Sequence, residues 1–249
     1  IGIGGDGSLS ILHRLAKQGG INLVGIPKTI DNDVAGTENS IGYLTAVDVA
    51  TDALDRLHPT AASHDRVMVL EVMGRDAGHI ALSAGISGGA DAILIPEIGW
   101  DIKSLANKII DVKESEKNFG LVIVAESAGS SIQDEYSLST LGNADNQGSI
   151  GYKVAQLITE TTGTETRVTV LGHVQRGGIP NSRDRLFASV FGVAAVDLIA
   201  EEKYNQLVVW SGRRCSHIPL EEAISTSHNV DPSGTLISTA RGLGIYVGN

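Results

Sequence analysis

The sequence contains only one cysteine, Cys215, so it cannot form an internal disulfide. A single unpaired cysteine suits a reducing compartment, and we therefore expect a cytoplasmic location. No apolar run approaches the roughly 20 residues that a membrane-spanning helix needs, and the start has no signal-peptide pattern. These absences argue against a membrane-spanning protein and against a disulfide-stabilised secreted one.

Positive charge is scarce as well. The chain has 19 lysines and arginines against 29 aspartates and glutamates, and its formal net charge is −10. This balance disfavours nonspecific binding to nucleic acid. It would also repel a phosphorylated ligand unless the few cations were gathered locally, so their positions guide the search for a site.

Aliphatic residues and glycine are abundant. Hydrophobic residues make up 42% of the chain and aromatic residues only 4%, with 30 glycines, as in α/β proteins whose strands are aliphatic. Apolar runs alternate with amphipathic stretches, which predicts βαβ units and mainly parallel sheets. We expect a helix over residues 40 to 58, a strand over 167 to 174 and a long helix over 183 to 203. The last ~35 residues show no clear pattern.

The segment "GGDGS", residues 4 to 8, lies between an expected strand and an expected helix. Glycines let the backbone approach a phosphate, and the N–H groups at a helix start attract anions. Asp6 suits a Mg²⁺ ion that bridges phosphate oxygens. The alternative is an ordinary turn between a strand and a helix.

The segment "GIPKTIDNDVAGTE", residues 25 to 38, places a lysine and several acids directly after an apolar run. If residues 28 to 33 are extended, Thr29, Asp31 and Asp33 point to the same side. Two carboxylates on one side raise each other's pKa, and one could act as a general base toward a hydroxyl. The alternative is a turn in which Asp31 or Asn32 caps backbone N–H groups.

Arginines lie beside glycines in "MGRDAGH", residues 73 to 79, and in "TETRVTVLGHVQRGG", residues 164 to 178. A guanidinium group binds phosphate in a bidentate manner, and neighbouring glycines leave room for the ligand. Taken singly, each arginine is more often a partner in a surface ion pair. Glu126 ends the apolar run "LVIVA", where ligands gather in open α/β sheets.

The motifs "GGDGS", "PKTIDND", "MGRDAGH", "VIVAES" and "GHVQRGG", in this order, resemble the 6-phosphofructokinase family from residue 1 to about residue 200. The resemblance implies two Rossmann-like α/β lobes with mainly parallel sheets and the active site in the cleft between them. It implies a donor-binding lobe of residues 1–42 and 175–212, and a sugar-phosphate-binding lobe of residues 43–174 and 213–249. It further implies transfer of a phosphoryl group from ATP to the 1-hydroxyl of fructose 6-phosphate, with Mg²⁺, in glycolysis.

The resemblance also implies roles for individual residues. Asp31 would be the catalytic base, and the other catalytic residues would be Lys28, Thr29, Asp33 and Arg75. Asp6 would hold Mg²⁺, and the donor would lie along Gly5, Asp6, Gly7 and Ser8. The sugar would contact Thr29, Asp31, Met73, Gly74, Arg75, Glu126, His173 and Arg176. Arg66 and Arg167 would reach the sugar 6-phosphate from a neighbouring subunit, which implies a homodimer or homotetramer.

The donor is the open point of the resemblance. Gly7 matches the ATP-using members, because the pyrophosphate-using members carry an aspartate at this position. Lys28 instead matches the pyrophosphate-using members. We expect ATP, with a pyrophosphate-dependent enzyme as the alternative and an inactive sugar-phosphate or nucleotide sensor as a further alternative. "GGDGS" alone also resembles lipid and NAD kinases, but "PKTIDND" and "GHVQRGG" argue against them. The family has a further glycine-rich loop upstream of "IGIGGDGS", so we expect an N-terminal segment to be missing, which leaves the activity of the chain as written open.

Overall fold

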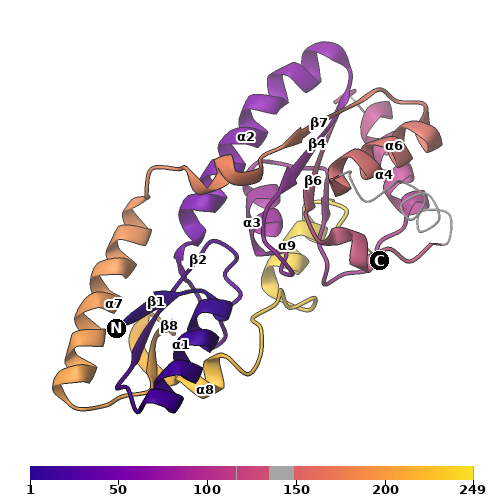
Figure 1. Cartoon of the computed structure of the whole chain (residues 1–249). Helices are drawn as coiled ribbons and strands as arrows, with labels where there is room; N and C mark the ends of the chain where they lie inside the picture. Colours follow the sequence, from indigo (N-terminus) through magenta and orange to yellow (C-terminus); the bar gives the residue numbers. More distant parts are fainter. Residues whose placement is uncertain (116, 135–148, 249) are drawn as a thin grey trace. The chain divides into compact units, whose positions relative to one another are not determined.

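The computed structural model describes residues 1–115, 117–134 and 149–248 (Figure 1). The chain forms two compact units. Unit 1 consists of Ile1–Ala46 and Ile179–His228, and unit 2 consists of Val47–Gly178 and Asn229–Asn249. The polar stretch of residues 129 to 147 predicts a loop, and most of it lies outside the described residues. Its first part forms a short 3₁₀ helix, η1 (Ala128–Ser131).

Unit 1 contains one sheet with the strand order β1-β2-β8-β9, and a short strand β3 also pairs with β2. Neighbouring strands are parallel except for the last pair, β8 and β9, which form an antiparallel hairpin. The bounds are β1 (Gly2–Gly4), β2 (Val24–Thr29), β3 (Ile41–Gly42), β8 (Gln206–Ser211) and β9 (Arg214–Pro219).

Helices cover both faces of this sheet. On one face, α1 (Asp6–Gly19) and the short α8 (Leu220–Ala223) bury Leu9, Ala16 and Leu220 against β8. On the other face, α7 (Ser182–Ala200) packs Phe187 and Phe191 against Val24, Ile26 and Val208. Along β8, Leu207 and Val209 face the first core and Val208 faces the second, so the alternation of this strand supplies both cores.

Unit 2 contains a fully parallel sheet with the strand order β5-β6-β4-β7 (Figure 1). Its strands are β5 (Ala92–Leu94), β6 (Gly120–Ala125), β4 (Val67–Val72) and β7 (Thr166–Val170). The helices around the sheet are α3 (His79–Ser87), α4 (Ile102–Glu114), α6 (Ile150–Thr162) and α9 (Thr235–Gly242). All six residues of β4 and of β6 are buried, as expected for central strands of a parallel sheet.

The predicted α/β fold with mainly parallel sheets is confirmed. Within the described residues, no helix is both long and apolar enough to cross a membrane. Three details of the structure differ from the prediction, and each has a physical reason.

The helix predicted over residues 40 to 58 runs from Tyr43 to His64 as α2 and contains Pro59. Proline lacks an N–H donor and destabilises a helix interior by about 3 kcal/mol. Leu57 and Ala61 nevertheless pack against Met68, Phe119 and Leu121. Burial of this apolar face offsets the cost of the proline, so the helix continues past it.

The strand predicted over residues 167 to 174 ends at Val170, and a 3₁₀ helix, η2 (Gly172–Arg176), follows it. Gly172 has a φ of 50°, which turns the chain out of the extended conformation. His173 and Arg176 therefore lie on a tight turn and not along a strand.

Unit 1 extends past residue 212, where the donor-binding lobe was predicted to end, because β9 and α8 belong to this unit. The edges of β8 and β9 pair along their whole length, from Gln206 with Pro219 to Ser211 with Arg214. The chain leaves unit 1 only after His228.

A buried carboxylate joins the starts of two helices within unit 1. Asp184, in the first turn of α7, is 2% exposed. It accepts hydrogen bonds from the backbone N–H groups of Gly42 at 3.0 Å and Thr45 at 2.8 Å, and from the Thr45 hydroxyl. Asp184 thus caps the N-terminus of α2, whose first N–H groups have no partner inside the helix.

The C-terminal segment returns to unit 2. Tyr246 exchanges backbone hydrogen bonds with Asp91 and Ile93 beside β5, and its hydroxyl accepts from the backbone N–H of Asp101 at 3.4 Å. Burial raises the pKa of the Tyr246 hydroxyl to about 12.

Candidate active site

The phosphate loop, residues 4 to 8, joins β1 to α1 in unit 1. Gly5 is the N-cap of α1 in an extended conformation, and no side chain caps this helix end. The backbone N–H groups of the first turn therefore point out of the helix, with Asp6 as its first residue. A helix start of this kind attracts phosphate oxygens.

The phosphate loop touches the acidic loop, which we define as residues 28 to 38. Gly4 is paired with Pro27 across β1 and β2, so the two loops leave adjacent strands at the same edge of the sheet. A Cβ atom placed on Gly5 would lie 3.1 Å from the Cβ of Thr29. Glycine at this position therefore allows the two loops to approach each other closely.

Thr29 and Asp31 form a side-chain pair at the end of β2. The Thr29 hydroxyl donates to Oδ2 of Asp31 at 3.2 Å, and it accepts from the Asp31 backbone N–H at 3.1 Å. Asp31 is 9% exposed, and Asp33 is also buried. The expected alternation of side chains stops at Asn32, which has a φ of 56°.

The Asn32 side chain closes the acidic loop. Its Oδ1 accepts from the backbone N–H of Ser40 at 2.8 Å, and its Nδ2 donates to the Glu38 carbonyl at 3.1 Å. The alternative interpretation, in which Asn32 caps backbone groups, is therefore correct for this residue. Asp31 is instead bonded to Thr29, and Lys28 is exposed at the end of β2.

Asp6 fits a Mg²⁺ ion that arrives with a phosphorylated ligand. Its carboxylate is partly exposed at the start of α1, and Mg²⁺ commonly takes one or two protein carboxylates together with phosphate oxygens and water. Within residues 1–115, 117–134 and 149–248, no group of three or more His, Cys, Asp or Glu side chains could hold a metal by itself.

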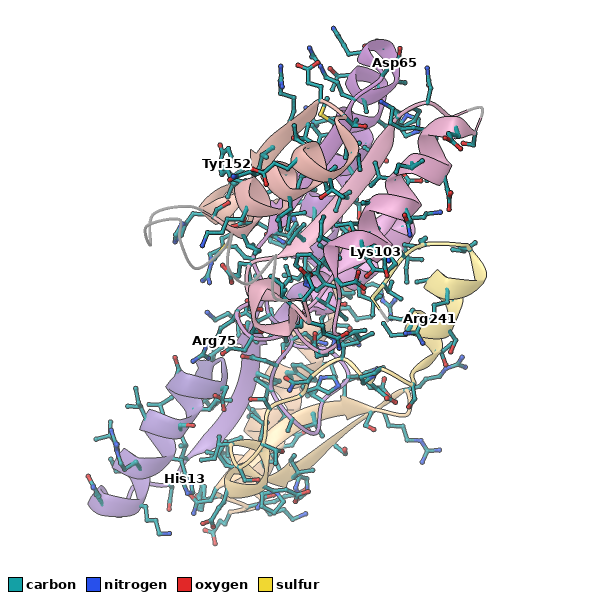
Figure 2. All side chains as sticks on the ribbon, turned by 90° about the vertical axis from the view of Figure 1, so that its right-hand side faces the viewer. His13, Asp65, Arg75, Lys103, Tyr152 and Arg241 are labelled. Carbon is teal, nitrogen blue, oxygen red and sulfur yellow. The ribbon has the colours of Figure 1, made fainter. Side chains whose placement is uncertain are left out.

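In unit 2, residues 73 to 75 form a turn after β4, which we call the Arg75 turn (Figure 2). Arg75 has a φ of 55°, a left-handed conformation that is uncommon outside glycine. Oε1 of Glu126 accepts from the backbone N–H groups of Gly74 at 3.1 Å and Arg75 at 2.6 Å. Two hydrogen bonds to one carboxylate hold this turn in place.

Gln175 ties the Arg75 turn to η2. Its side chain is 1% exposed, and its Oε1 accepts from the Met73 backbone N–H at 2.8 Å. Its neighbours His173 and Arg176 are exposed on η2. The structure thus brings Met73, Gly74, Arg75, Glu126, His173 and Arg176 together at the carboxyl edge of the unit 2 sheet.

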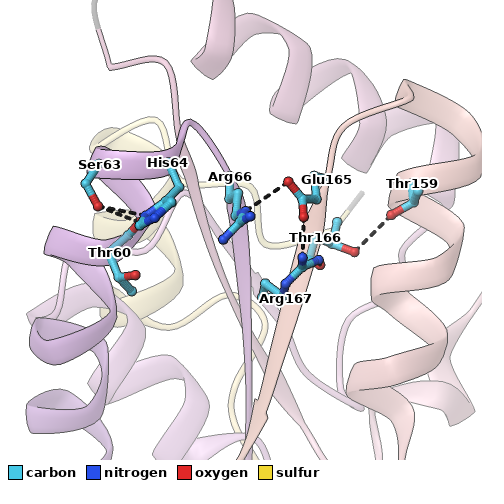
Figure 3. Close-up of polar contacts among 8 residues, drawn as sticks. All are labelled: Thr60, Ser63, His64, Arg66, Thr159, Glu165, Thr166 and Arg167. Carbon is cyan, nitrogen blue, oxygen red and sulfur yellow. Dashed lines mark hydrogen bonds and ion pairs between the residues drawn. The ribbon is translucent and has the colours of Figure 1, made fainter.

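Arg66 and Arg167 share one carboxylate, that of Glu165 (Figure 3). Nε of Arg66 lies 2.9 Å from Oε2 of Glu165, and Arg167 contacts the other oxygen. The hydrogen bond from Arg66 is the main reason that the pKa of Glu165 is lowered. These side chains are partly exposed, so the pairs themselves stabilise the fold little.

The two arginines lie at the opposite end of the sheet from the Arg75 turn. Arg66 precedes β4 and Arg75 follows it, while Arg167 is the second residue of the neighbouring β7. Six strand residues span about 20 Å at 3.3 Å per residue. Arg66 and the Arg75 turn of one unit 2 are therefore too far apart to bind the same small sugar phosphate.

Three residues of these clusters were not predicted from the sequence. Gln175 lies within the "GHVQRGG" motif and Glu165 within "TETR", so the motifs themselves could have indicated them. His228, whose contacts with the acidic loop are described below, lies in a segment without any recognisable pattern.

Comparisons of the sequence with a family model and with curated proteins all match phosphofructokinases. The phosphofructokinase family model matches residues 1–199. The chain is 62% identical to ATP-dependent 6-phosphofructokinase 1 of Synechocystis sp. over 249 residues, which is 100% of this chain and 69% of that protein. It is 51% identical to ATP-dependent 6-phosphofructokinase 2 of Nostoc sp., over 99% of this chain and 70% of that protein.

Solved structures agree with the fold. The pyrophosphate-dependent phosphofructokinase of Nitrosospira multiformis superposes with a TM-score of 0.80 at 20% identity, over 100% of this chain and 69% of that one. Phosphofructokinase from Saccharomyces cerevisiae superposes with a TM-score of 0.75 at 30% identity, over 97% of this chain and 33% of that one. From the match of the family model and the identity to curated relatives, the chain belongs to the phosphofructokinase family.

Proposed function

We propose that this protein is a kinase that transfers the γ-phosphoryl group of ATP to the 1-hydroxyl of fructose 6-phosphate, giving fructose 1,6-bisphosphate in glycolysis. Family membership and the names of the curated relatives support this activity. The observation that carries the proposal is the Thr29–Asp31 pair, held directly beside Gly5 of the phosphate loop. A carboxylate next to a phosphate-binding helix start is what phosphoryl transfer to a hydroxyl requires.

In this proposal Asp31 is the general base. The Thr29 hydroxyl binds Oδ2 and fixes the orientation of the carboxylate. The carboxylate would take the proton from the sugar 1-hydroxyl as the hydroxyl oxygen bonds to the γ-phosphorus, while the bond from this phosphorus to the bridging oxygen breaks and ADP leaves. Catalysis otherwise depends on position and on charge stabilisation. Lys28 and Arg75 would stabilise the charge on the transferred group, and Asp33 would assist charge and metal placement.

The donor would lie along Gly5, Gly7 and Ser8, with its phosphates at the N-terminus of α1. Asp6 would hold Mg²⁺, which when bound neutralises part of the charge on the donor phosphates. ATP is favoured over pyrophosphate because Gly7 leaves open space where the pyrophosphate users carry an aspartate. A Cβ atom on Gly7 would have no neighbour within 4 Å.

The sugar would contact Thr29, Asp31, Met73, Gly74, Arg75, Glu126, His173 and Arg176. Arg66 and Arg167 would bind the 6-phosphate of the sugar in a neighbouring subunit, because within one chain they lie at the far end of the unit 2 sheet from the other sugar contacts in that unit. The protein would then be a cytoplasmic homodimer or homotetramer. A monomer that binds fructose 6-phosphate with full affinity would contradict this arrangement.

Two measurements test the function. A turnover assay with fructose 6-phosphate, supplied with ATP or with pyrophosphate in the presence of Mg²⁺, measures activity and donor choice. Isothermal titration with fructose 6-phosphate measures binding independently of turnover. Binding without turnover with either donor would favour the alternative of an inactive sugar-phosphate sensor, and absence of both would refute the proposal.

A further inference from the structure

The acidic loop carries the proposed catalytic base, but little regular structure holds it. β2 ends at Thr29, and the backbone turns at Asn32. Beyond this point Val34 forms an isolated antiparallel bridge with Ser227. At Val34 the loop is therefore paired with the segment around Ser227, close to the place where the chain leaves unit 1.

One residue of that segment binds two consecutive carbonyl groups of the loop. The backbone N–H of His228 donates to the Asp33 carbonyl at 2.8 Å, and Nδ1 of its ring lies 3.0 Å from the Asn32 carbonyl. A carbonyl oxygen only accepts, so Nδ1 must carry the hydrogen. The ring is half-buried, which lowers competition from water for this bond.

These two carbonyl groups matter because they belong to Asp33 and to Asn32, which lies between the two aspartates of the loop. Asn32 follows Asp31 directly, and its left-handed backbone sets the direction in which the chain leaves Asp31. The Asn32 side chain already binds Glu38 and Ser40 and fixes the far side of the loop. The His228 ring contacts the Asn32 carbonyl and so holds the peptide group that follows Asn32.

We propose that His228 is a positioning residue for the proposed base Asp31, acting through the hydrogen bond from its Nδ1 to the Asn32 carbonyl. The catalytic part of this inference rests on the proposed function. Reaction rates are sensitive to small displacements of a catalytic group, and a shift of about 1 Å can lower a rate by about 100-fold. The backbone bond to Asp33 does not depend on the side chain, so a substitution at residue 228 can leave this bond in place while it changes the contacts of the ring.

Three substitutions separate the hydrogen bond from bulk and polarity. Asparagine places its amide nitrogen near the position of Nδ1, glutamine places it near the position of Nε2, and alanine removes the donor. We expect His228→Ala and His228→Gln to lower kcat by about 10-fold or more with a smaller change in KM for fructose 6-phosphate, and His228→Asn to retain most of the activity. His217→Ala is the matched control, because His217 is exposed on β9 and contacts Gln206.

Hydrogen exchange of a peptide covering the acidic loop, measured without ligands, gives a second readout that needs no activity. We expect exchange about 3- to 10-fold faster in His228→Ala and His228→Gln than in the wild type, His228→Asn and His217→Ala. If the wild type proves inactive while this exchange pattern holds, the proposed function fails and the positioning contact stands.

Several outcomes would overturn the proposal. One is an active wild type whose kcat is unchanged by both His228→Ala and His228→Gln. Another is equal exchange of the acidic loop in all variants. Loss of folding in both variants would also overturn it, because His228 would then stabilise unit 1 as a whole.

Discussion

Donor choice can be tested at a single position, Gly7. It is the second residue of α1, its φ lies outside the left-handed region, and a Cβ atom there would meet nothing within 4 Å. Aspartate should therefore fit without distortion. A negative charge in the first helical turn is itself stabilising by about 0.3 to 1 kcal/mol. Any loss of activity in Gly7→Asp would then reflect the ligand and not the fold.

The size of the effect follows from the distance between charges. Two like unit charges 4 Å apart repel by about 1 kcal/mol in water and by about 4 kcal/mol near a protein surface. Gly7 is exposed at the helix start, so we expect about 1 to 3 kcal/mol against the donor phosphates of ATP. This corresponds to a loss of about 5- to 150-fold in kcat/KM for ATP.

The assay compares kcat/KM for ATP and for pyrophosphate in the wild type, Gly7→Asp and Gly7→Asn, with thermal unfolding of each variant. Asparagine has nearly the size of aspartate but no charge, so it separates bulk from repulsion. We expect the wild type to prefer ATP, Gly7→Asp to discriminate less against pyrophosphate, and Gly7→Asn to lie between them. A wild type that prefers pyrophosphate would show that Lys28 is the better guide. Equal losses in the aspartate and asparagine variants would refute the electrostatic reasoning.

Four further changes have defined outcomes. Asp31→Ser should lower kcat by at least about 100-fold with little change in sugar affinity, and a near-normal kcat would exclude Asp31 as the base. Asp184→Ala leaves two buried donors of Thr45 and one partly buried donor of Gly42 without their acceptor and should destabilise unit 1 by about 3 to 5 kcal/mol in urea unfolding, with a loss below about 1 kcal/mol counting against the network. Glu165→Gln should lower KM for fructose 6-phosphate several-fold, because Arg66 and Arg167 would no longer share their charge with a carboxylate, and a higher KM would contradict this. The pKa of Tyr246 is near 10 in the unfolded chain and about 12 in the folded one, so the free energy of unfolding should fall as pH rises from about 10 to 12. The full difference in pKa corresponds to about 2.7 kcal/mol, which the partial exposure of the side chain reduces to about 1 kcal/mol. Tyr246→Phe should lose less stability over this pH range.

The strands of the fold, the phosphate loop and the Thr29–Asp31 pair could be predicted, because each depends on a short stretch of sequence. Buried parallel strands are continuous apolar runs, and the glycines of the phosphate loop mark a strand-to-helix turn. The close approach of Thr29 and Asp31 could also be expected, since they lie two residues apart. The roles assigned to these residues in catalysis stay predictions.

What could not be predicted depends on contacts between distant parts of the chain. The left-handed turn at Asn32 is held by Glu38, Ser40 and His228, and no local pattern predicts it. β9 lacks a regular alternation of buried and exposed residues, because its only partner is β8 at the edge of the sheet. The motif that contains Gln175 could have indicated the residue, but its hydrogen bond with the backbone of the distant Met73 could not be predicted.

The interleaving of the two units has a consequence for synthesis on the ribosome. Residues 47 to 178 contain all four strands of the unit 2 sheet, so this sheet can assemble while the chain is still growing. The sheet of unit 1 cannot, because Val24 in β2 pairs with Gln206 in β8. At a translation rate of about 5 to 20 residues per second, the N-terminal strands wait on the order of ten seconds or more for their partner. During that interval β1, β2 and the acidic loop are exposed to chaperones and proteases, so Asp31 is made long before β8 but is ordered only after β8 has joined the sheet.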